Sequence, residues 1–393
     1  MSKDSGFGIR PPLFAADLSG AANFGEPRQS AAREGGDSGL GMPAGPWLEG
    51  TRLLVVAPNW LGDAVMAIPV IHELRRREPA PRIVVAARRQ IAPIFEYVDG
   101  VDGIISLAGS GAPGNGRGGA DIAAMREAGA DVALLLPNSF RSAWQAWRAG
   151  VPERWGYRRD LRGRLLTKAI APPRTSLHQA EYYLELLRRL GLATGQPRPA
   201  LRVGDALREA GRELLRAAGW DTVAPLVGIA PGAAYGSAKR WPPGHVARFL
   251  DRLHGETNAV GVLFGSAHDA DGVGEIERDL RYSRRPLNVV GRTDLPQLMG
   301  AASWCEVFVS NDSGAMHIAS AIGLPIVAVF GPTREHETGP LTSRTGRPAP
   351  VVLTNPVWCR PCMLRECPID HRCMTGITPD QVFERVKPSL THS

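Results

Sequence analysis

The chain has 393 residues, of which 44% are hydrophobic, and a net charge of +7 at pH 7. The length suits two domains of ordinary size, and the composition is that of a globular protein. No stretch of about 18 apolar residues occurs, which excludes a membrane-spanning helix, and no basic start with an apolar core marks a secretory signal. We therefore expect a cytoplasmic protein.

The chain begins with a segment of unusual composition. Residues 1–50 are rich in Gly, Pro, Ala and Ser and show no sustained hydrophobic period, so they predict a disordered extension. From residue 51 on, short apolar runs typical of buried strands alternate with helical periods. The predicted strands are 53–57, 83–87, 133–136, 226–230, 260–264, 288–290, 307–310 and 326–330. The predicted helices are 64–77, 121–128, 178–191, 205–218, 244–254, 270–282, 295–302 and 314–322.

Continuous apolar strands separated by helices favour parallel sheets covered on both faces. The Pro-rich stretch 193–202 is typical of a linker, so we expect an α/β protein with two doubly wound domains, residues 51–203 and 204–393. Two such domains would create a cleft at the carboxyl ends of their strands, which is a usual place for a ligand.

The segment 307–333, VFVSNDSGAMHIASAIGLPIVAVFGPT, predicts a strand, a polar turn, a helix and a second strand. A helix start gathers free N–H groups and the positive end of the helix dipole, and Ser313 and Gly314 leave room there for a phosphate. His317 would project near the same place. The alternative is an ordinary capped helix with His317 in the core.

Three further motifs follow predicted strands. Asp63 in APNWLGDAVMAIP could be a helix cap or a general base at the cleft. Lys239 in PGAAYGSAKRWPP could be a surface lysine or, with the exposed backbone of this small-residue loop, a diphosphate contact. Asp269 in GSAHDADG could cap a helix or bond to a ribose or a sugar.

Four of the five cysteines lie close together near the C-terminus, as Cys359, Cys362, Cys367 and Cys373, in the spacing C-x₂-C-x₄-C-x₅-C. In a cytosolic protein this density points to a structural metal site, most plausibly zinc, rather than to disulfides. The alternative is four thiols packed in a loop. The basic surface suits an anionic partner, and the chain has no signature of a nucleic-acid-binding module.

Several motifs together resemble the bacterial lipopolysaccharide heptosyltransferases, glycosyltransferase family 9. These are NWLGDAVMAIP at 59–69, PGAAYGSAKRWP at 231–242 and SNDSGAMHIASAIGLPIVAVFGPT at 310–333. The segments LPNSFRSAW at 136–144 and CRPCMLRECPIDHRCM at 359–374 resemble in particular the branch of this family that adds the second heptose. The resemblance covers residue 51 to the C-terminus.

The resemblance implies a GT-B fold, in which two Rossmann-like domains face a central cleft, with the last helix packing back on the N-terminal domain. It implies an inverting transfer of L-glycero-D-manno-heptose from ADP-heptose to the first heptose of the inner core on Kdo-lipid A. No cofactor would be obligatory for catalysis. The enzyme would touch the anionic cytoplasmic face of the inner membrane. The alternatives are a family member acting on another core position, or a non-catalytic nucleotide- or metal-binding protein.

The same resemblance assigns roles to individual residues. Asp63 would be the catalytic base. The donor would be bound by Lys239, Asp269, Thr293, Asp312, Ser313, Gly314 and His317, with Thr293 near the adenine. The acceptor would be bound by Asn138, Arg158, Arg159 and Arg162.

Overall fold

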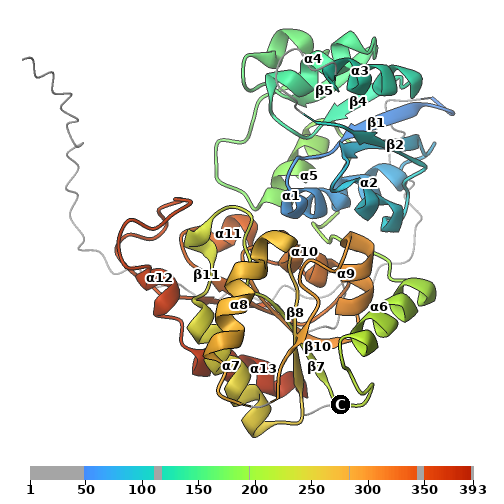
Figure 1. Cartoon of the computed structure of the whole chain (residues 1–393). Coiled ribbons are helices and arrows are strands. Elements are labelled where there is room, and N and C mark those ends of the chain that lie inside the picture. The colour runs from blue at the N-terminus through green and yellow to red at the C-terminus, as the bar shows by residue number, and fades with distance from the viewer. Residues whose placement is uncertain (1–47, 110–116, 194, 283, 343–348, 391–393) are drawn as a thin grey trace, which may run out of the picture. The chain divides into compact units, whose positions relative to one another are not determined.

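The structure is a computed structural model that describes residues 48–109, 117–193, 195–282, 284–342 and 349–390 (Figure 1). All of them belong to one compact unit, residues 42–393. The disorder expected for residues 1–50 concerns mainly residues 1–47, which lie outside the described residues.

The first half of the chain folds around a parallel sheet of six strands in the order β3-β2-β1-β4-β5-β6. The strands are β1 (Arg52–Val56), β2 (Arg82–Arg88), β3 (Gly103–Leu107), β4 (Val132–Leu135), β5 (Glu153–Tyr157) and β6 (Lys168–Ile170). The central strands are almost continuously buried, which is why their sequences read as unbroken apolar runs.

The second half repeats this arrangement in a sheet of order β12-β11-β10-β7-β8-β9. Its strands are β7 (Leu226–Ala230), β8 (Val260–Leu263), β9 (Leu287–Asn288), β10 (Cys305–Asn311), β11 (Ile326–Phe330) and β12 (Val351–Thr354). In both sheets the first strand lies at the centre, the next two follow on one side and the last three on the other. This is the doubly wound order of a Rossmann fold, and it confirms the predicted pair of parallel sheets.

Helices connect the strands and cover the sheets. The helices of the first half are α1 (Leu61–Met66), α2 (Ile68–Arg75), α3 (Arg117–Glu127), α4 (Phe140–Arg148) and α5 (Gln179–Arg189). Those of the second half are α6 (Asp205–Ala217), α7 (Pro243–Glu256), α8 (Ala270–Asp279), α9 (Leu295–Ala302), α10 (Gly314–Ala321), α11 (Glu335–Thr338), α12 (Arg372–Thr375) and α13 (Pro379–Leu390). We call the first sheet with α1–α5 the first lobe, and the second sheet with α6–α13 the second lobe.

One sequence detail shapes the first lobe near its centre. The helical period expected over 64–77 is divided at Ala67, with Pro69 in the first turn of α2. Proline has no N–H to donate and fits the first turn, where no partner is needed. The short α1, which begins five residues after the end of β1, is thereby separated from α2.

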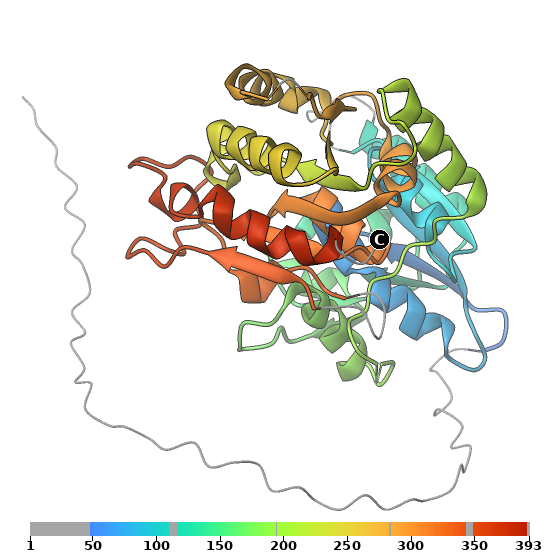
Figure 2. The same ribbon diagram turned by 90° about the horizontal axis from the view of Figure 1, so that it is seen from below.

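The position of the last helix differs from the expectation. α13 packs against α7, β10 and β11 of the second lobe, not against the first lobe. In Figure 2 it lies, in red, between the yellow α7 and the orange strands. Val382, Phe383 and Val386 are fully buried in the core of the second lobe, so burial of this apolar face fixes α13 there. No helix within the described ranges is long and apolar enough to cross a membrane.

Candidate active site

Four of the predicted site residues follow the strands at which the strand order of each sheet reverses. β1 and β4 are neighbours at the centre of the first sheet, and β7 and β10 at the centre of the second. The segments that follow these four strands carry Asp63, Asn138, Lys239 and Asp312. Ligands of doubly wound proteins bind at such reversal points, outside the carboxyl ends of the strands.

The two reversal points meet, because α1 packs against α10 (Figure 1). Glycines on both helices allow this close approach. A Cβ atom at position 62 would lie 2.8 Å from Cδ2 of His317, and one at position 314 would lie 2.7 Å from Cδ2 of Leu61. Contacts this short are not tolerated, so each glycine admits a side chain from the opposite lobe.

Asp63 stands in the first turn of α1, whose N-cap is Trp60. The helix has no side-chain cap, and no described residue donates a hydrogen bond to the Asp63 carboxylate, so the capping interpretation does not apply here. Burial raises the pKa of Asp63 to about 6; the nearby charge of Lys239 lowers it, and that of Asp312 raises it. Asp63 is thus a half-buried carboxylate whose pKa suits a general base near neutral pH.

Lys239 belongs to the loop after β7 and is nearly buried, with 12% of its side chain exposed. Its Nζ donates a hydrogen bond of 2.5 Å to Oδ2 of Asp312 and lies 4.7 Å from the centre of the Tyr235 ring. Oγ1 of Thr333 donates a second bond, of 2.7 Å, to the same carboxylate oxygen. The loops after β7, β10 and β11 are therefore joined at Asp312.

Asp312 is therefore not placed as a residue that contacts the sugar donor directly. Its side chain is 6% exposed, and one of its oxygens accepts both of these bonds. A carboxylate would repel a diphosphate, but a carboxylate paired with Lys239 instead fixes the direction of the ammonium group. We therefore interpret Asp312 as a residue that positions Lys239.

Asn311 is a site residue that the sequence analysis missed. It is 2% exposed; its Oδ1 accepts from the backbone N–H of Trp241 (3.1 Å), and its Nδ2 donates to the carbonyl of Pro231 (2.6 Å). One side chain thus holds both ends of the loop that carries Lys239. The only sign of this role in the sequence is the place of Asn311 beside Asp312 at the end of a predicted strand.

The start of α10 has the open backbone that the sequence predicted. Ser313 is its N-cap, yet the hydroxyl bonds to Ser310 Oγ (3.1 Å) rather than capping a helix N–H. His317, one turn later, is 4% exposed, and burial lowers its pKa to about 4, so it is neutral at pH 7. His317 faces Gly62, and its role as a donor ligand stays a prediction.

Two predicted donor residues lie farther along the second sheet. Oδ2 of Asp269 accepts from the N–H and the hydroxyl of Ser266, both at 2.9 Å, which completes a capping box. Its Oδ1 lies 3.7 Å from Nη2 of Arg240, and the carboxylate packs on Gly232 in the Lys239 loop. Thr293 is half-buried just beyond β9, at the carboxyl end of the sheet. The structure brings Asp269 to the Lys239 loop, and the ligands of both residues remain predictions.

The predicted acceptor residues divide into two groups. Arg158 and Arg159 are exposed. Arg162 is wholly buried: its guanidinium donates to the carbonyls of Tyr157 and Pro137, with Nε 2.9 Å from the former. Arg162 therefore cannot reach an acceptor, and the expectation for it is wrong. It holds the loop after β4 instead, where its Nη2 lies 3.4 Å from Oδ1 of Asn138.

Asn138 is half-buried and donates through Nδ2 to the hydroxyl of Tyr182 (2.9 Å). Its contact with an acceptor stays a prediction.

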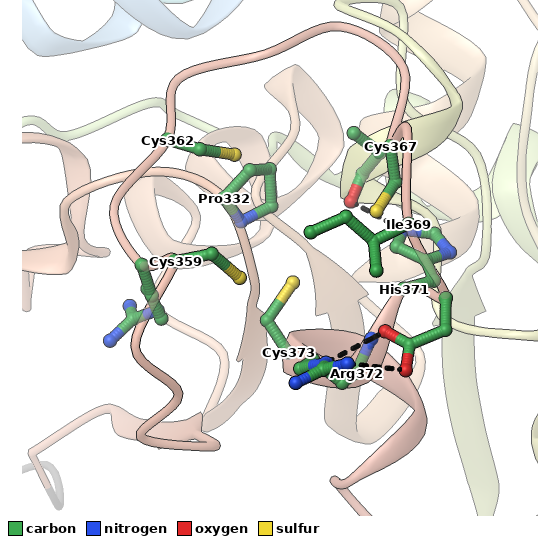
Figure 3. Close-up of a pocket in the computed structure, with 11 residues that line it drawn as sticks. Pro332, Cys359, Cys362, Cys367, Ile369, His371, Arg372 and Cys373 are labelled. Carbon is green, nitrogen blue, oxygen red and sulfur yellow. Dashed lines mark hydrogen bonds and ion pairs between the residues drawn. The ribbon is translucent and has the colours of Figure 1, made fainter.

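The four clustered cysteines, Cys359, Cys362, Cys367 and Cys373, line one pocket of the second lobe, and all four are free thiols (Figure 3). In the part of the chain that the structure describes, no three potential ligand groups are already placed to hold one metal ion.

Comparison with known proteins agrees with this geometry. Residues 122–372 match the model of glycosyltransferase family 9 (heptosyltransferase). Lipopolysaccharide heptosyltransferase 2 of Salmonella typhimurium is 33% identical over 348 residues, which cover 86% of this chain and 99% of that protein. The solved structure of Escherichia coli ADP-heptose lipopolysaccharide heptosyltransferase II superposes with a TM-score of 0.73 at 29% identity, covering 87% of this chain and 99% of that one.

A more distant neighbour, E. coli heptosyltransferase WaaC with ADP, has a TM-score of 0.65 at 17% identity, covers 86% of this chain and all of that one, and supports the fold alone. The chain belongs to glycosyltransferase family 9 and is a glycosyltransferase with the GT-B arrangement of two Rossmann-like domains.

Proposed function

We propose that this family 9 glycosyltransferase transfers L-glycero-D-manno-heptose from ADP-heptose to the first heptose of a lipopolysaccharide inner core, with inversion at the anomeric carbon. The observation that carries the proposal is the meeting of Asp63, from the first lobe, with the Lys239–Asp312 pair of the second lobe. Relatives named as heptosyltransferase 2, which align over nearly their whole length, support the choice of sugar and acceptor.

An inverting transfer needs a base on one face of the sugar and a stabilised leaving group on the other. Asp63 supplies the base, because a carboxylate with a pKa of about 6 is mostly ionised at pH 7 yet basic enough to take a proton from a hydroxyl as it attacks. Its place at the lobe contact lets it serve an acceptor held by the first lobe and a donor held by the second.

The leaving ADP gains negative charge as the glycosidic bond breaks. Lys239 brings a positive charge to the point where the strand order of the second sheet reverses. Asp312 and Thr333 fix the position of its ammonium group before any substrate arrives. The uncapped start of α10, at Ser313 and Gly314, adds N–H groups and the positive end of a helix dipole. Groups oriented in advance stabilise developing charge without having to reorganise.

We further propose that the first lobe meets the lipid-linked acceptor at an anionic membrane surface. α4 exposes Phe140 (49%), Trp144 (37%) and Trp147 (48%) at helical spacing, and it packs on the turn Arg162–Leu165, which follows the exposed Arg158 and Arg159. Aromatic rings beside arginines favour the interface of an anionic bilayer. The protein should sediment with phosphatidylglycerol vesicles and not with phosphatidylcholine vesicles; equal binding to both would contradict this contact.

A mass-spectrometric transfer assay tests the proposed function. Purified enzyme receives ADP-heptose, ADP-glucose or UDP-glucose, with Kdo-lipid A acceptors that carry or lack the first heptose. We expect product only from ADP-heptose and the heptosylated acceptor. Product on the acceptor without heptose would assign the enzyme to another core position, and no product with any pair would contradict the proposal.

A further inference from the structure

The segment between β12 and α12 lacks a hydrophobic core of its own. It has no regular secondary structure, and none of the side chains from 355 to 371, all of them described, is buried. Ordering a residue costs about 1–2 kcal/mol of backbone entropy, and a segment ordinarily offsets this cost by burying apolar groups. Apart from Val357, which packs against the core of the second lobe, this segment must be held by something other than apolar burial. We call it the cysteine strap, residues 355–371.

The cysteine strap packs on the loop that carries Lys239. The N–H of Ala238 donates to the carbonyl of Arg365 (2.9 Å), and the carbonyl of Ala238 lies 2.7 Å from Nε2 of His371. The hydroxyl of Tyr235 donates to the carbonyl of Met363 (2.8 Å). Both the backbone N–H and the carbonyl of Ala238, the residue before Lys239, are thus bonded to the strap.

The strap also reaches the loop after β11. Nε of Arg360 donates to the carbonyl of Gly331 (2.6 Å), and its Nη2 donates to the carbonyl of Thr333 (3.2 Å) and to Oε2 of Glu335 (2.6 Å). Thr333 is the residue whose hydroxyl bonds to Asp312, the partner of Lys239. The strap therefore braces two of the three loops that fix the position of the Lys239 ammonium group.

Four thiols surround one pocket between the strap and α12. Cys359, Cys362 and Cys367 come from the strap and Cys373 from α12, and their side chains lie around a common space beside Pro332 and Ile369 (Figure 3). Burial raises the pKa of Cys373, and the charges of the other three thiols raise it further. Cysteine is normally among the most buried residues, yet Cys362 is exposed and two others are half-buried. Packing does not explain this placement.

We propose that Cys359, Cys362, Cys367 and Cys373 together bind one thiophilic divalent cation, Zn²⁺ or Fe²⁺, as a structural cross-link that holds the cysteine strap against the Lys239 loop. Four thiolates in tetrahedral arrangement are the donor set that these cations take. Among the described residues no three ligand groups are placed to hold a metal ion, so binding would require the sulfurs to move toward one another. Each thiol gives its proton to solvent as the thiolate binds, and no oxidation or reduction takes place.

The neighbouring imidazole is not needed for this site. Nε2 of His371 is already engaged by the carbonyl of Ala238. The fifth cysteine, Cys305, is buried in β10 and belongs to the core of the sheet. Cys305 thus offers a matched control, a thiol of the same chain outside the pocket.

The test is the metal content of the full chain, purified without a metal-affinity step and measured by inductively coupled plasma mass spectrometry. We expect about one equivalent of zinc or iron per chain, and the element found identifies the ion. The double variant Cys359→Ser/Cys362→Ser should lose it, and Cys305→Ala should keep it. Full metal content in the double variant, or no metal in the unmodified chain, would overturn the proposal.

A second measurement protects the test against misfolded variants. Unmodified protein is stripped with a chelator and titrated with Co²⁺, which should give the visible and near-ultraviolet absorption of tetrahedral cobalt thiolate. Loss of the ion should also raise the number of thiols that react under native conditions; unchanged thiol reactivity and no cobalt spectrum would contradict the site. These readouts do not depend on the proposed transfer reaction. The effect on Lys239 does rest on that function, and we expect stripping to raise the KM for ADP-heptose.

Discussion

Gly62 of α1 lies directly against the imidazole of His317 of α10, so that a Cβ at position 62 would come 2.8 Å from Cδ2 of that ring. Asp63, the proposed base, is the next residue in the chain, and the contact therefore sets how its carboxylate stands toward the second lobe. We therefore expect a side chain at position 62 to affect catalysis.

Gly62→Ala should move α1 away from α10 and displace Asp63. A displacement of about 1 Å can reduce a rate by about 100-fold, so we expect a loss of that order in kcat with little change in unfolding temperature. Gly274→Ala on α8 is the control, because its Cβ would meet open space. Equal activity of the two variants would show that the Gly62 contact does not position the base.

The pH dependence of transfer should report the protonation of Asp63. Because the folded-state pKa is raised to about 6, the base is ionised above that pH and protonated below it. We expect kcat/KM to fall about tenfold per pH unit below pH 6 and to be level above it until another group titrates. A profile that is flat down to pH 4.5 would contradict the assignment.

Lys239→Ala removes the ammonium group next to Asp312 and leaves the buried Asp312 carboxylate with the Thr333 hydroxyl but without a cationic partner. We expect the Kd for ADP-heptose, measured by calorimetry, to rise by about 10- to 100-fold, which corresponds to a lost charge-assisted contact of about 1.5–3 kcal/mol. Lys387→Ala, at an exposed position of α13, is the control. Unchanged donor affinity in the Lys239 variant would remove this lysine from the site.

Arg162→Leu should destabilise the first lobe rather than weaken acceptor binding specifically. The variant removes the hydrogen bonds that the buried guanidinium donates to the carbonyls of Tyr157 and Pro137, and a loss of about 3 kcal/mol in the free energy of unfolding is expected. The exposed pair Arg158→Ser/Arg159→Ser should unfold like the unmodified chain and raise the KM for the acceptor. Chemical denaturation and steady-state kinetics on both variants separate the two effects.

Much of this site could be predicted because it lies at strand ends. A buried parallel strand reads as a continuous apolar run, and the polar residue that follows it falls at the carboxyl edge of the sheet. Asp63, Lys239 and Asp312 were found in this way, and the structure brings them together. What local sequence could not reveal is that Asp312 is paired with Lys239.

The failures have a common cause in tertiary structure. Arg162 belongs to a basic run typical of an exposed surface, and only the fold shows that backbone carbonyls surround it. Asn311 acts through bonds to residues about 70 to 80 positions away, which no local pattern contains. Four strands were missed for different reasons. β3 and β12 are mostly half-buried strands at the sheet edges, β5 begins with the charged Glu153 and Arg154, and β6 has three residues.

The most direct test of the account is Asp63→Asn, with single-turnover transfer and ADP-heptose binding measured on the same preparation. We predict a loss of about 100- to 10,000-fold in the rate of transfer, with the donor Kd unchanged within about a factor of two. The pKa of Asp63 is higher in the folded protein than in the unfolded chain, so its ionisation lowers the stability of the fold as the pH rises from about 4 to 6. Asn carries no such charge, and the variant should therefore be at least as stable as the unmodified chain at pH 7. Normal turnover by Asp63→Asn would contradict the central claim that Asp63 is the base.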